Sequence, residues 1–137
     1  SSSTSQIIQH SPVYSFVVDV SQQMRVLCHA QSEFFGQPHV LYILNCGLAG
    51  RNGRVQQAGQ VWGMDFVLVD KELLQPTRAF AFTYVEVTVL EREEFMALVD
   101  RHDTVCPGLK QRIRHFCCWL AFQRALLHEA QRRRRGD

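Results

Sequence analysis

Side chains that could perform catalysis or bind a metal are scattered along this sequence. The histidines show no His-Glu-x-x-His motif or paired metal-ligand spacing, and no Ser/His/Asp or Cys/His set can be assembled with any specificity. The paired acids Glu93 and Glu94 lie where a helix is expected to begin, a position that suits acidic side chains. The sequence therefore predicts a protein that is not an enzyme and holds no metal. Surface or core roles are favoured for His29, His39, His102, His115 and His128.

The cysteines favour a reduced protein. They are odd in number and show no Cys-x-x-Cys spacing, so an intracellular chain without disulfides is the simplest account. Two of them adjoin, so at most one of that pair can face the core of a helical segment. The five cysteines are Cys28, Cys46, Cys106, Cys117 and Cys118.

One polar loop stands between two apolar runs. Within VWGMDFVLVDKELLQPTRAFAFTYVEV (Val61–Val87), the loop DKELLQPTR, residues 70–78, is polar. A hydrophobic core does not need such a loop, which raises the question of whether it binds a ligand. Asp65 and Arg78 are the charged side chains that could bind a ligand there, although solvated loop charges are the simpler reading. Trp62 could stack on a base, but an aromatic residue inside a β run is more often part of the core.

Composition indicates one globular domain. The chain has 137 residues, of which 46% are hydrophobic and 20% charged. No apolar run approaches the roughly 18 residues that span a bilayer, and SSSTSQ at the start lacks the pattern of a signal peptide. Leu109–Asp137 holds eight basic and two acidic residues, which leaves seven basic and eleven acidic residues before it. The basic character belongs to one terminal element, which argues against a general nucleic-acid binder, and no specific nucleic-acid partner is expected.

The first third of the chain is predicted to be helical. Pro12 could open a helix, Asp19 could cap the next one, and apolar side chains follow at helical spacing. Those side chains are Val20, Met24, Leu27 and Cys28.

From Phe34 the pattern changes to short antiparallel strands and tight turns. RNGR at Arg51–Arg54 carries the Asn-Gly pair of a two-residue hairpin. The segment AFAFTYVEVTVL alternates, which predicts a strand with one buried face. Val85, Val87 and Val89 should point inward, with Tyr84, Glu86 and Thr88 on the other face.

Two helices are predicted after this strand. EREEFMALVDRH is amphipathic, and Pro107 and Gly108 then break the chain. From Leu109 the apolar residues recur at the spacing of an amphipathic helix, which predicts a helix of about 25 residues. Its apolar stripe is Leu109, Ile113, Phe116, Leu120 and Leu127.

Three motifs, in order, resemble the cyclic-nucleotide-binding domain family. LYILNCGLA resembles the family strand LYIIxxGxV, AGQVWGMDFVL resembles GxxFGExxLL, and FTYVEVTVLEREEF resembles the xTYCxLxxLxRxxF of channel members. The resemblance extends from Val40 to Leu127 and implies an α+β fold: a small antiparallel β jelly roll with N-terminal helices and two C-terminal helices. The Thr-Tyr pair resembles voltage-gated channels of the hyperpolarization-activated and ether-à-go-go kinds. The segments GLAGRNGRV and VWGMDF resemble those of protist proteins.

The family resemblance also sets the expected boundaries. Residues 1–11 are expected to be a linker or disordered end, 12–130 the domain, and 131–137 a basic tail. Only six residues separate Phe35 from Tyr42, where the family usually has two more strands, which indicates a shortened roll or a natural chain of which part is absent.

The resemblance implies a pocket that lacks its usual ligand groups. The family holds the nucleotide phosphate with an arginine and the ribose 2′-hydroxyl with a glutamate. Here Met64 follows Gly63 where the glutamate belongs, with Asp65 one place late. Gln75 stands at the arginine position, and Arg78 comes three residues later, after Pro76 and Thr77. Cyclic AMP or cyclic GMP is therefore disfavoured, no cofactor is expected, and Phe80, Phe82 or the last helix is expected to fill the pocket.

The predicted function is a non-catalytic regulatory or assembly domain of an ion channel or larger complex, on the cytosolic face. One alternative is a structural subunit that keeps the fold for protein contacts. Another is a nucleotide sensor with a re-registered cassette, meaning a ligand loop whose phosphate-binding arginine has moved three residues along, to Arg78. The last helix is predicted to dock as a lid through Leu109, Ile113, Phe116 and Leu120. Its remainder, including the basic patch Arg132, Arg133, Arg134 and Arg135, fits lid docking or binding to calmodulin or an anionic membrane surface about equally.

Overall fold

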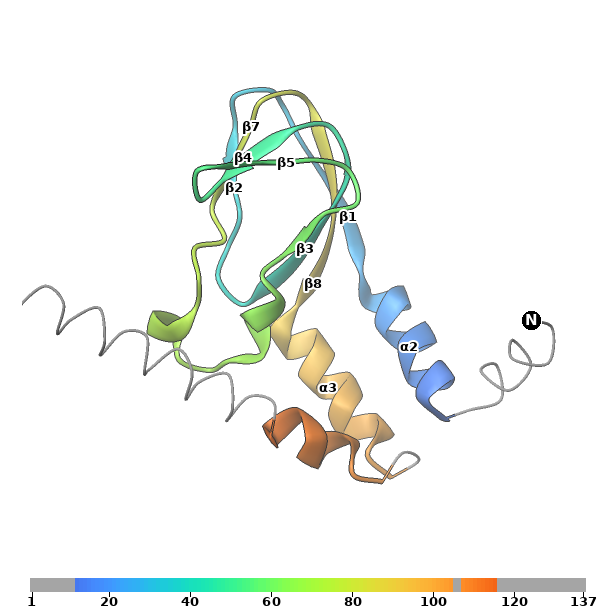
Figure 1. Cartoon of the computed structure of the whole chain (residues 1–137). Coiled ribbons are helices and arrows are strands. Elements are labelled where there is room, and N and C mark those ends of the chain that lie inside the picture. The colour runs from blue at the N-terminus through green and yellow to red at the C-terminus, as the bar shows by residue number, and fades with distance from the viewer. Residues whose placement is uncertain (1–11, 105–106, 116–137) are drawn as a thin grey trace, which may run out of the picture.

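Two four-stranded antiparallel sheets form a β jelly roll with helices at one end (Figure 1). The computed structural model describes residues 12–104 and 107–115. One sheet has the strand order β1-β8-β3-β6, and the other has the order β2-β7-β4-β5. The strands are β1 (Arg25–His29), β2 (Phe34–Phe35), β3 (Val40–Cys46), β4 (Ala49–Arg51), β5 (Arg54–Gln56), β6 (Val61–Trp62), β7 (Ala79–Ala81) and β8 (Val85–Glu91).

The alternation predicted for β8 is confirmed. Val85, Val87 and Val89 are buried between the sheets, whereas Glu86 and Thr88 lie on the outer face. There the side-chain amide of Asn45 donates to Thr88 Oγ1 at 2.7 Å and to Glu86 Oε2 at 3.3 Å. A slip of one residue would bury Glu86, so the pattern fixes the register.

The core combines large aromatic side chains with small ones. Tyr42 stacks on Trp62 with ring centroids 5.5 Å apart, and Phe35 lies 6.1 Å from both rings. On the facing sheet Ala79 and Ala81 of β7 are buried, which leaves room for these rings between the two sheets.

The Asn-Gly hairpin is also confirmed. Asn52 and Gly53 both have positive φ, 53° and 75°, and connect β4 to β5 with Arg51 opposite Arg54. This is the backbone of a type I′ turn, whose twist matches that of paired strands.

The helical prediction for Leu27 and Cys28 is wrong. Helix α2 (Pro12–Gln23) ends before them, and both residues lie in β1, where Leu27 pairs with Val87 and Cys28 with Glu86. Pairing with the central strand β8 satisfies the backbone of this segment, and that outweighs a local spacing typical of a helix. Although only six residues separate Phe35 from Tyr42, the described residues form eight strands, two of which, β1 and β2, come before β3.

Helices α2 and α3 (Arg92–His102) pack side by side below the sheets (Figure 1), and α3 matches the helix predicted after β8. A partly buried side-chain contact joins them, with His102 Nε2 2.6 Å from Asp19 Oδ2. A second small core forms where Leu90, on the outer face of β8, meets Phe66 and Val67. The ring of Phe95 in α3 packs on this cluster, 5.3 Å from that of Phe66.

The start of the last helix follows the prediction. Gly108 has φ 87° and residues 109–115 are helical, with Leu109 and Ile113 half-buried. Lys110 contacts the preceding helix through an ion pair of 3.0 Å with Asp100. Phe116, Leu120 and the basic patch Arg132–Arg135 lie outside the described residues, so the lid and the basic helix stay predictions.

Candidate ligand pocket

The candidate pocket is built where β6 leads into the polar loop. After β6 the chain turns at Gly63, which has φ 79°, and enters the 3-10 helix η1 (Met64–Val67). A Cβ at Gly63 would lie 2.4 Å from the carbonyl oxygen of Val40, so only glycine fits this turn without displacing backbone. A second 3-10 helix, η2 (Lys71–Leu73), begins the polar loop itself.

Asp65 anchors the loop. Its side chain is 5% exposed, and Oδ2 accepts the backbone N–H of Gln75 at 2.9 Å. The acid that stands one place late for a ribose contact is therefore engaged by the protein's own chain.

Arg51 reaches the same loop from β4. Its Nη1 donates to the carbonyl oxygen of Pro76 at 2.8 Å, and its guanidinium carbon lies 5.8 Å from the centroid of the Trp62 ring. Its Nε is buried and has no hydrogen-bond partner in the described part of the chain. Burial lowers the pKa of Arg51, and the charge of Asp65 opposes that shift.

Sequence reasoning treated Arg51 only as a hairpin residue. The available signal was alternation, because Ala49 faces the core and Arg51 is two residues later on the same strand. A charged residue at an inward position of a short strand is uncommon and suggests a polar partner inside.

Trp62 holds the next loop residue. Its indole Nε1 donates to the carbonyl oxygen of Thr77 at 3.2 Å, and the side chain is 2% exposed, which confirms its placement in the core. Gly36 lies against the same carbonyl, where a Cβ would come within 2.2 Å. Three side chains from β4, β6 and η1 thus bind backbone groups of three successive residues, 75 to 77.

The other predicted pocket residues point elsewhere. Met64 is 68% exposed, and the side chains of Gln75 and Pro76 are exposed as well. Arg78 lies with its guanidinium carbon 4.7 Å from the centroid of the Phe34 ring. The structure therefore gathers Gly63, Asp65 and the backbone of 75–77, but not Met64 or Arg78.

The expected filling by Phe80 or Phe82 is not seen. Strand β7 turns Ala79 and Ala81 inward and Phe80 outward, while Phe82 is 44% exposed and covers Gly50 on the outer side. Phe80 and Phe82 alternate with Ala79 and Ala81, and only the small alanine side chains fit into the crowded interior. Arg51 takes an inward position instead, and the last helix beyond residue 115 lies outside the described residues.

A hollow of about 420 Å³ opens between β1 and β2, and Arg78 of the predicted ligand loop is part of its lining. Its lining includes Arg25, His29 and Tyr42, and Arg25 is paired with Glu91 at 2.6 Å. The Tyr42 hydroxyl accepts the backbone N–H of Gln37 at 2.8 Å, and burial raises the pKa of Tyr42.

Within residues 12–104 and 107–115, no group of three or more His, Cys, Asp or Glu side chains could hold a metal ion. In the same residues no helix combines the length and the apolar character that crossing a bilayer requires.

No protein-family model and no curated protein matches this sequence. Among solved structures, the chain is similar to the regulatory domain of Toxoplasma gondii PKA in its co-crystal structure with cAMP. The TM-score is 0.48 and the identity 17%, over 77% of this chain and 42% of the other, so this chain spans less than half of that one. The match is one of shape alone.

Proposed function

We propose that this chain is a non-catalytic regulatory or assembly domain of the cyclic-nucleotide-binding type whose ligand pocket is closed by its own residues. The observation that carries the proposal is the use of Asp65, Arg51 and Trp62 to bind the backbone of residues 75–77. Asp65 and Arg51, which could meet a ribose hydroxyl or a phosphate, are thereby committed to the protein, whereas Arg78 is exposed and lies over the Phe34 ring.

The expected binding free energy of a nucleotide supports the same conclusion. Without an arginine–phosphate contact a site loses on the order of 1.5–3 kcal/mol, and an unpaired ribose hydroxyl adds roughly 1–3 kcal/mol. A micromolar site would weaken to roughly 0.1–10 mM. Freeing Arg51 from Pro76 and Asp65 from Gln75 would cost further binding energy.

Calorimetric titration with cyclic AMP and cyclic GMP tests the proposal, on protein checked for bound ligand. We expect no binding tighter than about 100 μM. A low-micromolar heat signal would overturn the closed pocket.

One observation favours the sensor as a second candidate. The buried Nε of Arg51 makes no hydrogen bond to any described residue, so this guanidinium retains a donor inside the pocket. If the domain is a sensor, Arg51→Ala should abolish the heat signal. Arg78→Ala would abolish it only if the cassette had moved its arginine three residues along.

The wider setting is part of the proposal. We place the domain in an ion channel or a larger complex, on the cytosolic face of the membrane, with protein partners rather than nucleic acid. The runner-up is a structural subunit that keeps the roll for protein contacts. Transmembrane helices upstream in the full gene product would favour the channel over the subunit.

The proposal extends to the partner of the basic C-terminal segment, which can be tested separately. Calmodulin or an anionic membrane surface could bind Phe122–Arg135, which carries large apolar and basic side chains. A peptide of that segment should bind calcium-loaded calmodulin or vesicles rich in phosphatidylserine, and failure with both would leave the docked lid as the better account.

A further inference from the structure

The outer face of the sheet β2-β7-β4-β5 carries an apolar row on the side opposite the core. Phe34 pairs with Phe80, Phe80 with Gly50, and Gly50 with Val55, so the row crosses all four strands. Phe82 covers the glycine, because a Cβ there would lie 2.7 Å from its ring. Phe34 is 60% exposed, Val55 55% and Phe82 44%. We call this set, Phe34, Val55, Phe80 and Phe82, the outer row.

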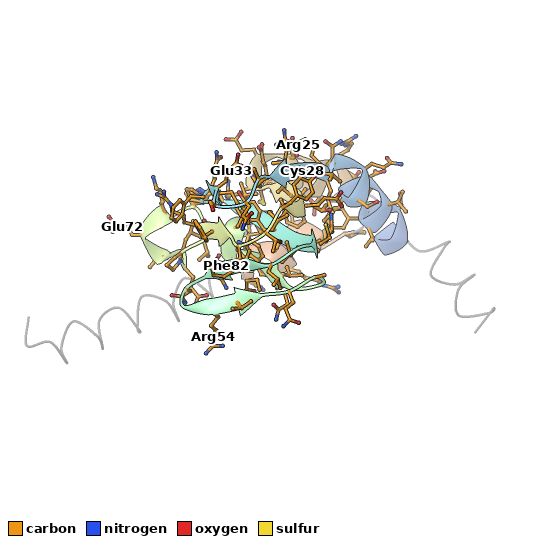
Figure 2. The ribbon with its side chains drawn as sticks, turned by 90° about the horizontal axis from the view of Figure 1, so that it is seen from above. Arg25, Cys28, Glu33, Arg54, Glu72 and Phe82 are labelled. Atoms are coloured by element: carbon orange, nitrogen blue, oxygen red, sulfur yellow. The ribbon has the colours of Figure 1, made fainter. Side chains whose placement is uncertain are left out.

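The outer row lines an open groove of about 520 Å³. Helices α2 and α3 pack together at the end of the roll, against β8 and η1, and neither contributes a residue to the lining of the groove. Figure 2 shows Arg54 projecting outward from the β4–β5 hairpin. Large apolar side chains that adjoin on an uncovered sheet face are typical of an interaction surface.

The charges around the groove indicate the kind of partner. Arg51, Arg54 and Arg78 line it, and no carboxylate of the described residues does. A partner that brings acidic side chains beside apolar ones would be complementary to this surface.

The edge of the sheet indicates the form of the partner. Since Arg51 and Arg54 close a two-residue hairpin, the next residue, Val55, directs its backbone N–H and C=O away from β4. Strand β5 is the edge of its sheet, so an extended segment could pair with it and continue the outer row.

Other occupants fit less well. A second copy paired through β5 would bring two sets of arginines together, and the C-terminal part of this chain is itself basic. Single-stranded nucleic acid needs open ring faces, but Phe34 is covered by Arg78 and meets Phe80 edge-on, as Phe80 meets Phe82.

We infer that the outer row and the edge of β5 bind an extended segment of a partner protein that carries acidic and large apolar side chains. The groove shares Arg51 and Arg78 with the predicted loop site, but the outer row and the edge of β5 do not belong to that site, so the inference does not depend on nucleotide binding there.

Selection from a random peptide library on the immobilised chain tests this inference. We expect enriched peptides with net negative charge and at least two large apolar residues. By fluorescence anisotropy, Arg54→Glu and Phe82→Ser should each weaken the best peptide by at least about tenfold. The matched controls Arg101→Glu and Val69→Ser, both exposed and away from the groove, should leave its affinity unchanged.

Folding of each variant is checked by its melting curve. Arg54 is exposed in the hairpin and should tolerate replacement, and Val55→Ser replaces Phe82→Ser if that variant does not fold. Absence of enrichment, binding insensitive to Arg54→Glu, or displacement of the peptide by single-stranded oligothymidylate would each overturn the inference.

Discussion

The buried carboxylate of Asp65 accepts the backbone N–H of Gln75 at 2.9 Å, ten residues along the chain. This contact ties Gln75, within the polar loop, to η1, the 3-10 helix that precedes the loop. Burial lowers the pKa of Arg51, and the charge of Asp65, held nearby, acts to raise it. The loop is therefore held from within, by a residue that a sequence comparison would take for a displaced ligand group.

Replacing Asp65 should destabilise the protein. Asp65→Ala leaves the N–H of Gln75 without its acceptor and the half-buried Arg51 without a neighbouring charge, so we expect a loss of about 2–4 kcal/mol in the free energy of unfolding. Urea denaturation of wild type and variant measures this loss. Glu72→Ala, at an exposed position of η2 in the same loop, should change it by less than about 0.5 kcal/mol. Equal effects at the two sites would contradict the anchoring role of Asp65.

The turn at Gly63 can be tested against a glycine of similar backbone conformation. Gly63 and Gly59 both have positive φ, 79° and 92°, but a Cβ at Gly59 would meet nothing within 4 Å. Gly59→Ala should thus cost only the conformational term, about 1–2 kcal/mol. Gly63→Ala should cost clearly more, because its Cβ would meet the backbone of Val40. Thermal melting of both variants measures the difference, and a smaller shift for Gly63→Ala would show that the turn can relax.

Alkaline pH should reveal the burial of Tyr42. Burial raises the pKa of Tyr42 above its ordinary value of 10.0, and the charge of Glu91 acts in the same direction, while the N–H of Gln37 opposes them. The neutral hydroxyl is favoured by the fold, so its stabilising contribution is complete below the unfolded pKa. It is lost as the pH rises from about 10 through the folded pKa.

The measurement is the free energy of unfolding between about pH 9 and pH 11 in wild type and in Tyr42→Phe. We expect the decline with pH to be shallower in the variant. The comparison is repeated with Tyr84→Phe in both proteins, because a side-chain hydrogen bond with Cys28 raises the pKa of the exposed Tyr84 as well. Identical slopes in wild type and Tyr42→Phe would mean that the Tyr42 hydroxyl titrates as freely in the folded state as in the unfolded one.

The sequence by itself determined the elements whose signal is local. Strict alternation fixed which face of β8 is buried, Asn52-Gly53 fixed the hairpin, and the acidic start and apolar spacing of α3 fixed that helix. In each case the covalent neighbours within a few residues supply the physical constraint, so the pattern can be read without knowing the partners.

Only the tertiary structure decided β1 and the contacts that hold the polar loop. Leu27 and Cys28 have a spacing that suits a helix, but hydrogen bonding to β8, about 60 residues away in sequence, makes them a strand. Likewise, nothing near Arg51 in sequence reveals Pro76 as its acceptor, or that Asp65 would bind Gln75. These outcomes depend on contacts between distant segments, whose energies are set by packing and burial rather than by local preference.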